Sequence, residues 1–502
     1  MRMAIKRGSI VVIGVIMQIF LSVFVLLVFG QRIAFVEGFY SILSVLLVLG
    51  IIKESKSLSK DLPWIIIIMV FPIIGALLYI VIGGNLKKSK ILKSINKSEA
   101  AGMKYLVQEK SVKEEIENQN NGKLKYLMNY LGFPVTKNND IKYYPFGELA
   151  YKDMLEELKQ AKKFIFLEYF IIKKGKMWDE ILNILEQKAS EGIEIRLIYD
   201  DMGCIAFLPS DYPKKIEEKG IKCIAFNKLN PFLGVILNNR DHRKMMIIDG
   251  KTVFSGGMNL ADEYINIEHP YGVWKDNGIR IKGDAVWNFT VMFLNMWNSY
   301  RNQDEDYEKY KYGFENENLK TNGYVVPYGE SPLDNEITGE NVYLNLINQA
   351  EKYVYIFTPY LIIDTDMINS IILASKRGVD VRMVVPGIPD KKIVYSLTTS
   401  YFETLIKNGV KIYKYTPGFV HSKVFVSDDK YATVGTINLD YRSLYLHFEC
   451  GVFMQDVKEI SDVKKDLLDA IAESHLVTKN EATPRFLKGL WQAVLRLFAP
   501  LM

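Results

Sequence analysis

A histidine and a lysine two residues apart occur twice in the chain, each time in the same local context. Every residue of the second set follows its counterpart in the first by 179 positions. Five matched residue types at one offset indicate a duplicated functional unit. The first set is His242, Lys244, Asp249, Gly256 and Asn259, and the second is His421, Lys423, Asp428, Gly435 and Asn438.

The residue types predict phosphoryl-transfer chemistry. An imidazole can act as nucleophile or proton donor, and a lysine can neutralise a phosphate oxygen. A histidine and a lysine two apart on a strand point to the same face. If the two copies face each other, one imidazole can attack phosphorus while the other protonates the leaving oxygen. Two lysines and the amides of Asn259 and Asn438 would then hold the phosphate.

Four acidic residues accompany the two motifs. Asp249 and Asp428 each end a predicted strand, so either a turn-forming or a catalytic role fits them. Asp276 and Glu449 follow the two motif histidines by 34 and 28 residues. Each could accept a hydrogen bond from an imidazole and fix its tautomer. The remaining histidines that we considered, His269 and His447, lack a lysine partner and are interpreted as structural.

The pattern around these motifs predicts an α/β fold made of two repeats. A helix with its apolar face at residues 151, 154, 155 and 158 is followed by an apolar strand at 164–172. Another helix then precedes a strand at 193–199. Similar segments recur near 352–361 and 374–382. We therefore expect one repeat at 143–310 and a second at 325–475, together forming one pseudo-symmetric catalytic unit.

The first 85 residues contain three apolar stretches, at about 9–30, 33–52 and 62–84. A helix of about 20 such residues crosses a bilayer, so the sequence predicts N-terminal transmembrane helices in region 1–85. A secretory signal peptide is the alternative for the first stretch. Flanking lysines and arginines balance, so charge leaves the orientation open. Residues 86–142 are interpreted as a juxtamembrane linker.

The C-terminal segment, 476–502, predicts an amphipathic helix. Leu487, Leu490, Trp491, Val494 and Phe498 fall on one helical side, with basic residues elsewhere. This pattern is typical of a helix at a membrane interface. Packing against the catalytic domain is the alternative.

Composition narrows the function classes. A net charge of +5 over 502 residues is small for a nucleic-acid-binding protein, so we expect no nucleic-acid partner. The three cysteines form no metal-like spacing, so we expect neither a disulfide framework nor a metal. Since one chain carries both motifs, a dimer is not required to complete the site, and the oligomeric state stays open.

The motifs resemble the phospholipase D superfamily, whose hallmark is a paired H-x-K-x4-D motif. The segments 239–244, 256–264, 274–276, 418–423, 434–443 and 448–449 are similar to those of bacterial cardiolipin synthases, as is 62–88. The resemblance covers about residues 40–502. Two transmembrane spans are commoner in that family, so the extra predicted span at the N-terminus, about 9–30, is a departure.

The resemblance implies an enzyme of a bacterial cell membrane, with several spans. It would convert two phosphatidylglycerol molecules to cardiolipin and glycerol without a cofactor. His242 would form a phosphohistidine, and His421 would protonate glycerol and then activate the second hydroxyl. Pseudo-symmetry allows the two histidines to exchange roles. The alternatives are a phospholipase D-type hydrolase, transfer to another alcohol, a nuclease, and a non-catalytic scaffold.

Overall fold

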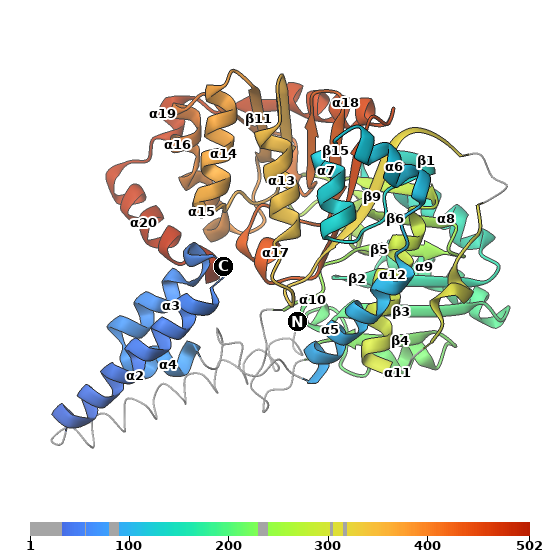
Figure 1. The fold of residues 1–502 in the computed structure, drawn as a ribbon, viewed down its shortest axis with the longest axis horizontal. Helices are drawn as coiled ribbons and strands as arrows, with labels where there is room; N and C mark the ends of the chain where they lie inside the picture. Colours follow the sequence, from blue (N-terminus) through green and yellow to red (C-terminus); the bar gives the residue numbers. More distant parts are fainter. Residues whose placement is uncertain are drawn as a thin grey trace.

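The computed structural model describes residues 33–55, 57–79, 90–228, 239–301, 305–314 and 319–501. Most of their strands join one 15-stranded mixed sheet, in the order β17-β12-β11-β10-β14-β15-β16-β9-β1-β8-β6-β5-β2-β3-β4. The order reads the same outward from the antiparallel β1–β9 pair, apart from the extra β17. The predicted pair of α/β repeats is therefore present, and Figure 1 shows them side by side.

The first half of the sheet pairs β2, β3 and β4 in parallel and β5, β6, β8 and β1 in antiparallel fashion. Its strand β1 begins at Thr136, within the segment that the sequence assigned to a linker. The strands are β1 (Thr136–Tyr144), β2 (Phe164–Tyr169), β3 (Glu194–Asp200), β4 (Lys222–Phe226), β5 (Met245–Ile248), β6 (Thr252–Gly256) and β8 (Gly278–Gly283).

The second half repeats this arrangement, with β10, β11 and β12 parallel. Its strands are β9 (Lys320–Glu330), β10 (Tyr353–Phe357), β11 (Asp380–Pro386), β12 (Lys411–Tyr415), β14 (Val424–Ser427), β15 (Tyr431–Gly435), β16 (Glu449–Gln455) and β17 (Ser474–Leu476). A separate two-stranded parallel sheet joins the halves, made of β7 (Val273–Lys275) and β13 (Gly418–Val420).

Helices cover both faces of the sheet, which explains why β2 is buried along its whole length. α8 and α9 share one core with the outer face of the first half, and α13 and α14 do so in the second. α12 and α18 belong to a central core that both halves share. These helices are α8 (Gly147–Gln160), α9 (Lys176–Ser190), α12 (Val286–Arg301), α13 (Thr338–Asn348), α14 (Thr365–Lys376) and α18 (Ile460–Ala472).

Shorter helices lie around this body. α5 packs on α12 and buries Leu92 and Ile95. These helices are α5 (Lys90–Gly102), α6 (Lys110–Asn118), α7 (Gly122–Lys125), α10 (Asp201–Cys204), α11 (Tyr212–Glu217), α15 (Lys392–Ser400), α16 (Phe402–Lys407), α17 (Tyr441–Tyr445), α19 (Lys479–Ala482) and α20 (Phe486–Leu497).

The predicted N-terminal transmembrane helices are wrong for the described part of the chain. None of the helices in the described residues is long and apolar enough to cross a membrane. The predicted span 62–84 is divided at Phe71, where α3 (Leu58–Val70) ends and α4 (Pro72–Leu78) begins. Pro72 disfavours helical geometry at the residue before it, and Phe71 has φ −127° and ψ 76°. The 13 residues of α3 extend only about 20 Å.

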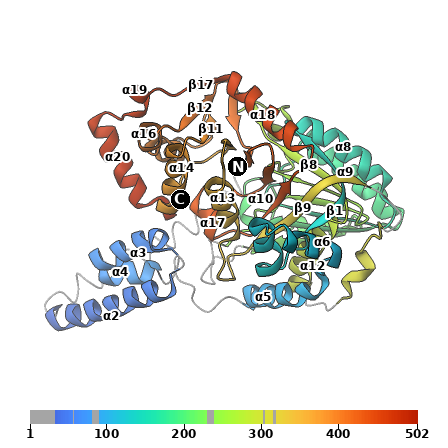
Figure 2. The ribbon, with the colours of Figure 1, turned by 45° about the horizontal axis from the view of Figure 1, so that its top comes forward.

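Of the other two predicted spans, one falls in a helix that the structure describes and the other does not. Residues 33–52 lie in α2 (Ile33–Glu54), which packs against α3 through Val48, Ile51 and Ile68. Figure 2 shows α2, α3 and α4 as a small bundle beside the α/β body. The span predicted at 9–30 lies outside the described residues.

Candidate active site

The two histidine–lysine motifs lie immediately before equivalent strands. His242 and Lys244 precede β5, and His421 and Lys423 precede β14. The sequence pattern predicted each pair on a strand, whereas the structure places each in the segment that leads into one. Since β5 runs antiparallel to β2, this segment lies at the carboxyl end of β2. Ligand sites of α/β sheets commonly occupy that end.

Each histidine is held by an acid from the opposite half of the protein. Nδ1 of His242 lies 2.8 Å from Oε2 of Glu449. Nδ1 of His421 lies 2.7 Å from Oδ2 of Asp276. Both acids are completely buried. The sequence spacing associated each acid with the histidine of its own half, so the crossed pairing is a correction.

Backbone contacts between the halves enforce this crossing. The amide of His242 donates to the carbonyl of Phe448 at 2.9 Å, directly beside Glu449. The amide of His421 donates to the carbonyl of Lys275 at 2.7 Å, directly beside Asp276. The parallel β7–β13 pair continues this second contact. Each motif histidine therefore takes its carboxylate partner from the other half.

The motif lysines are buried and carry perturbed pKa values. Burial lowers the pKa of Lys244 to about 8, although Glu449 opposes the shift. Burial lowers the pKa of Lys423 to about 7, with Asp276 opposing and Lys244 adding to the shift. Nζ of each lysine donates to the carbonyl of the histidine two residues earlier. Near pH 7 Lys244 is thus mostly charged and Lys423 about half charged, and a bound phosphate would favour the charged form of both.

The two imidazoles favour the neutral form. Burial, followed by the charges of Lys244 and Lys423, holds the pKa of His242 well below its ordinary value. Burial and Lys423 lower the pKa of His421 to about 4, against the opposing effect of Asp276. A neutral imidazole that donates from Nδ1 to a carboxylate has a free lone pair on Nε2. Nε2 is then available as a nucleophile or base.

The two motif asparagines are buried but differ in their bonding. Oδ1 of Asn259 accepts from the amide of Ile171 at 2.9 Å, and its Nδ2 donates to the hydroxyl of Tyr264 at 2.7 Å. This side chain is thus engaged in the scaffold. Oδ1 of Asn438 has no hydrogen-bond partner among the described residues.

The structure places the motif aspartates at the other end of their strands. The carboxylate of Asp249 accepts from the backbone amides of residues 162, 163 and 164 at 2.7–2.9 Å. Asp428 does the same for residues 351, 352 and 353 at 2.8–3.0 Å. Asp249 follows Lys244 by five residues, most of them in β5, a distance of up to about 16 Å. The aspartates are therefore not brought together with the histidines.

Two residues that contact the site acids were not predicted from the sequence. Gly257 leaves room for Asp276, since a Cβ there would lie 2.0 Å from Oδ1 of that acid. Its counterpart 179 residues later is Thr436, whose hydroxyl donates to Oε2 of Glu449 at 2.5 Å. The sequence signal is a difference between the two equivalent turns, 256–259 and 435–438. The half that supplies Asp276 has a glycine at the second position of its turn, and the half that supplies Glu449 has a threonine there.

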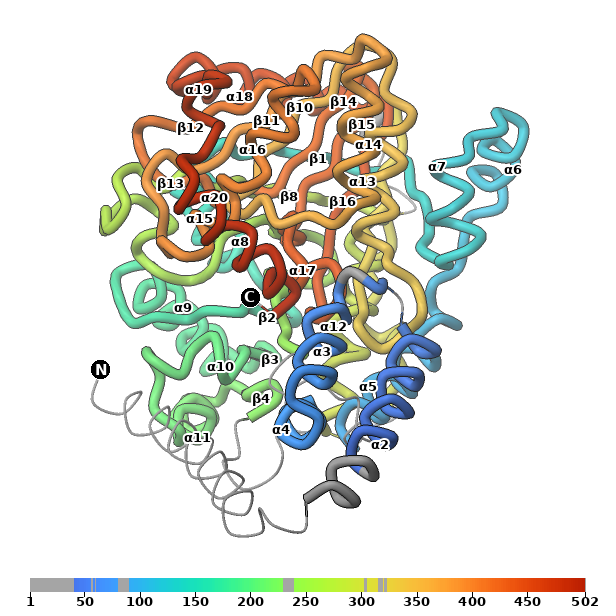
Figure 3. Tube along the Cα trace, turned by 90° about the vertical axis from the view of Figure 1, so that its left-hand side faces the viewer, coloured from blue at the N-terminus to red at the C-terminus, as the bar shows by residue number. Residues whose placement is uncertain are grey.

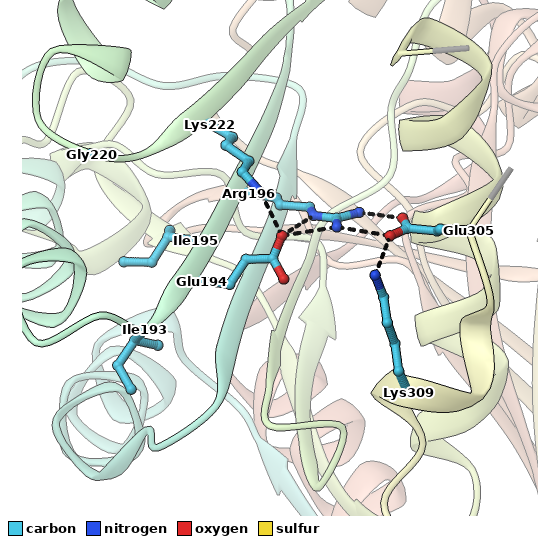
Figure 4. A pocket seen from close by; sticks show the side chains of 8 residues that line it. All are labelled: Ile193, Glu194, Ile195, Arg196, Gly220, Lys222, Glu305 and Lys309. Atoms are coloured by element: carbon cyan, nitrogen blue, oxygen red, sulfur yellow. Dashed lines mark hydrogen bonds and ion pairs between the residues drawn. The ribbon is translucent and has the colours of Figure 1, made fainter. Parts of the chain in front are cut away.

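A pocket of about 660 Å³ lies away from these residues, at the amino end of β3. Figure 4 shows that its charged side chains are joined in one ion-pair network. The central pair is Arg196 with Glu305, at 2.6 Å. Because β2 and β3 run parallel, this pocket and the histidines occupy opposite ends of the strands.

Comparison with known families is consistent with the duplicated site. The family model described as "Cardiolipin synthase, PLD-like domain" matches residues 154–297 and 343–470, which contain both motifs. The chain belongs to the cardiolipin synthase family. A second model, described as "Phospholipase_D-nuclease N-terminal", matches residues 42–84 of this cardiolipin synthase family member.

Relatives of this cardiolipin synthase family member extend over nearly the whole chain. An uncharacterized protein of Streptococcus mutans is 44% identical over 464 residues, covering 91% of this chain and 99% of its own. A cardiolipin synthase of Staphylococcus aureus is 32% identical and covers 90% of this chain and 93% of its own. A cardiolipin synthase of Halalkalibacterium halodurans is 29% identical, with 93% and 94% covered.

A solved structure supports the fold of this cardiolipin synthase family member. The phosphatidylserine synthase of Haemophilus influenzae superposes with a TM-score of 0.57 at 16% identity. The match covers 76% of this chain and 98% of that one. At this identity the similarity establishes the mixed α/β fold.

Proposed function

We propose that this chain transfers a phosphatidyl group from one phosphatidylglycerol molecule to another, giving cardiolipin and glycerol. The observation that carries the proposal is the crossed pairing of two acid–imidazole pairs around two buried lysines. Such a site has a nucleophile, a proton carrier and a positively charged phosphate cradle, which are the groups that a two-step displacement needs. Membership of the family supports a phosphatidyltransferase activity.

In the first step, Nε2 of His242 attacks phosphorus and the bond from phosphorus to the glycerol oxygen breaks. The departing oxygen takes a proton from Nε2 of His421. A bound phosphodiester adds negative charge beside Lys244 and Lys423, which raises the pKa of His421 and lets it carry that proton. Glu449 stabilises the positive charge that forms on His242.

In the second step, Nε2 of His421 accepts the proton of a hydroxyl group on the second phosphatidylglycerol. The hydroxyl oxygen attacks phosphorus, and the bond from phosphorus to Nε2 of His242 breaks. Both imidazoles return to their initial state, so no net proton is consumed. Asp276 keeps the proton of His421 on Nδ1 between the steps. We propose that Asn438 contributes its amide to the phosphate cradle, whereas Asp249 and Asp428 position the strands.

The substrate is a lipid, and α20 offers a surface that suits a lipid bilayer. Its polar side faces inward: Gln492 is buried and donates to the carbonyl of Ser396 at 3.0 Å. Nε of Arg496 donates to the hydroxyl of Ser400 at 2.9 Å. Leu495 is buried as well, in the core of the second half. The apolar side chains on the opposite side point outward, with Phe486 84% and Leu487 77% exposed.

We propose that this outward side rests on an anionic bilayer at the headgroup level. Arg485 and Lys488 lie exposed beside the apolar side chains, as expected for a surface that meets acidic headgroups. The short helix after α20, Ala499–Leu501, packs against α3. Figure 3 shows α20 and the α2–α3 pair on the same side of the molecule. α3 also exposes apolar side chains, Met69 and Val70 among them.

Product analysis by mass spectrometry tests the reaction. The purified protein is incubated with phosphatidylglycerol in liposomes, alongside His242→Ala, His421→Ala and the control His269→Ala, whose side chain is exposed. Wild type and control should give cardiolipin and glycerol, and the two site variants neither. Phosphatidic acid as the main wild-type product would indicate a hydrolase instead. Cardiolipin undiminished in both site variants would overturn the assignment of residues.

A further inference from the structure

An aromatic residue two positions before each active-site acid lies against one of the motif histidines. The ring centroid of Trp274 is 5.4 Å from that of His421, with the ring planes at 46°. The ring centroid of His447 is 5.6 Å from that of His242, with the planes at 43°. The two halves of the site thus place an indole and an imidazole in equivalent positions.

The two aromatic residues differ in what their ring nitrogens can bind. The indole nitrogen of Trp274 has one hydrogen, which it directs to Oδ2 of Asp276 at 3.5 Å. Among the described residues, neither ring nitrogen of His447 has a hydrogen-bond partner, although the side chain is more than 90% buried. Its Nδ1 lies 3.8 Å from Oε1 of Glu449, which is too far for a hydrogen bond.

His447 therefore presents one donor and one acceptor beside the nucleophile. Burial and the nearby His242 and Arg442 lower the pKa of His447 to about 4, against the effect of Glu449. A neutral imidazole has one N–H and one lone pair. Its backbone amide donates to the carbonyl of Arg442 at 2.9 Å, which fixes its place. Buried polar groups of this kind are normally satisfied, so a polar ligand is the expected partner.

We propose that His447 holds one hydroxyl group of the acceptor polyol, so that a second hydroxyl of the same molecule reaches the phosphohistidine. The inference rests on the proposed phosphatidyl transfer and assigns the choice of acceptor alcohol to His447. A hydroxyl can donate to the unprotonated ring nitrogen of His447 or accept from the protonated one, so either nitrogen can hold it. One ring nitrogen of His242, one ring nitrogen of His447 and one carboxylate oxygen of Glu449 lie within 4.8 Å of one another, so His447 lies beside the nucleophilic imidazole. A vicinal diol that is held at one oxygen by His447 can bring its neighbouring oxygen toward the phosphohistidine.

The same arrangement disfavours water as the acceptor. Water has a single oxygen, which must make any bond to His447 and also attack phosphorus, so no separate group holds it in place. The glycerol headgroup of phosphatidylglycerol has two free hydroxyls, one of which can be held while the other reacts. Trp274 cannot take over this role, because an indole nitrogen accepts no hydrogen bond. His447 thus acts as a specificity residue for alcohols that carry a neighbouring hydroxyl.

Competition between two matched alcohols tests this proposal. The protein receives labelled phosphatidylglycerol in liposomes with equal concentrations of 1,2-propanediol and 1-propanol, and the two phosphatidyl alcohols are quantified. The wild type should favour the diol. His447→Phe should reduce this preference about tenfold, the loss expected for one hydrogen bond, and raise phosphatidic acid relative to cardiolipin. His447→Gln, which keeps a donor and an acceptor, should retain much of the preference.

The outcomes separate this proposal from the one on which it rests. Equal use of both alcohols by the wild type, or an unchanged preference in His447→Phe, would overturn the role of His447. A rate loss in His447→Phe that is equal for both alcohols would show a merely structural role. If the wild type forms no transfer product from any alcohol, the phosphatidyl-transfer function itself fails. If His447→Phe does not fold, the alcohol preferences of the wild type and of His447→Gln still decide the question, because the proposal expects both to favour the diol.

Discussion

Nδ1 of His242 lies 2.8 Å from Oε2 of Glu449, although 207 residues separate the two in the chain. The reciprocal contact joins His421 to Asp276 over 145 residues. Each half of the protein thus supplies the imidazole of one pair and the carboxylate of the other. This exchange makes the two repeats a single catalytic unit, because separating them would break both pairs.

Removing the charge of either acid should reduce turnover strongly. Glu449→Gln and Asp276→Asn keep the shape but no longer favour a proton on Nδ1 of the paired imidazole. A decrease in kcat of about 10²–10⁴-fold is expected from related acid–histidine pairs. Cardiolipin formation and thermal unfolding are measured together, with Asp469→Asn as an exposed control.

The two acid variants should also stop the reaction at different stages. Acid-quenched mass spectrometry of the protein should show less covalent phosphatidyl-histidine in Glu449→Gln. In Asp276→Asn, the adduct on His242 should accumulate if the second step becomes limiting. Turnover that is unchanged in both variants would refute the role of the crossed pairs.

Adding a single methyl group at Gly257 should disable the site. A Cβ there would lie 2.0 Å from Oδ1 of Asp276, so the carboxylate must move away from His421. Displacements of about 1 Å cost on the order of 100-fold in rate. Gly122→Ala is the matched control, since its Cβ would meet no atom within 4 Å. Full activity of Gly257→Ala with intact folding would contradict the geometry of this acid.

Substitution of the motif aspartates should lower the stability of the protein more than it lowers kcat. Asp249→Asn weakens three bonds to backbone amides at the start of β2. The free energy of unfolding should fall by about 1–3 kcal/mol, and Asp428→Asn should behave alike at β10. Thermal unfolding is followed for each variant, and kcat is measured at a temperature well below the unfolding transition. A large loss of kcat with unchanged stability would favour direct catalysis instead.

The pH dependence of kcat/KM should show a loss of activity on the alkaline side. The pKa values of Lys423 and Lys244, about 7 and about 8, lie below the ordinary 10.5. These ammonium groups therefore lose their charge, and with it their affinity for phosphate, as the pH rises through 7 to 8. Because kcat/KM reports the free enzyme, the bound phosphate does not mask this loss.

A permanently charged side chain provides the control for that assignment. Lys423→Arg should move the alkaline limb upward by about one pH unit, to the position set by Lys244, since arginine stays protonated. Its maximal rate should be lower, because the guanidinium is larger. An alkaline limb that keeps its position in this variant would assign the titration to another group.

The outward side of α20 should enter the headgroup region of an anionic bilayer. The three cysteines are free and buried, so a cysteine introduced at Leu487 can be labelled selectively with a polarity-sensitive fluorophore. Its emission should shift to the blue on phosphatidylglycerol vesicles, and less on phosphatidylcholine. The control label at Asn480, exposed on α19, should stay unchanged. An unshifted emission at Leu487 would exclude this contact.

The N-terminal region shows where sequence patterns were insufficient. Mean apolarity predicted a continuous span at 62–84, whereas Pro72 ends α3 after 13 residues. A hydropathy pattern measures side chains and does not register the missing amide hydrogen of a proline. Pro63 lies inside α3 without ending it, so the presence of a proline alone does not predict where the helix is divided.

The sequence by itself determined the duplicated α/β architecture and the histidines and lysines that mark its site, because strand periodicity and motif spacing are local properties. Only the tertiary structure decided which acid holds which histidine. That pairing depends on backbone contacts between residues such as His242 and Phe448, far apart in the chain. It also distinguished Asp249 from Asp276, since a strand of fixed rise carries the first away from the site while the crossing of the halves brings the second to His421.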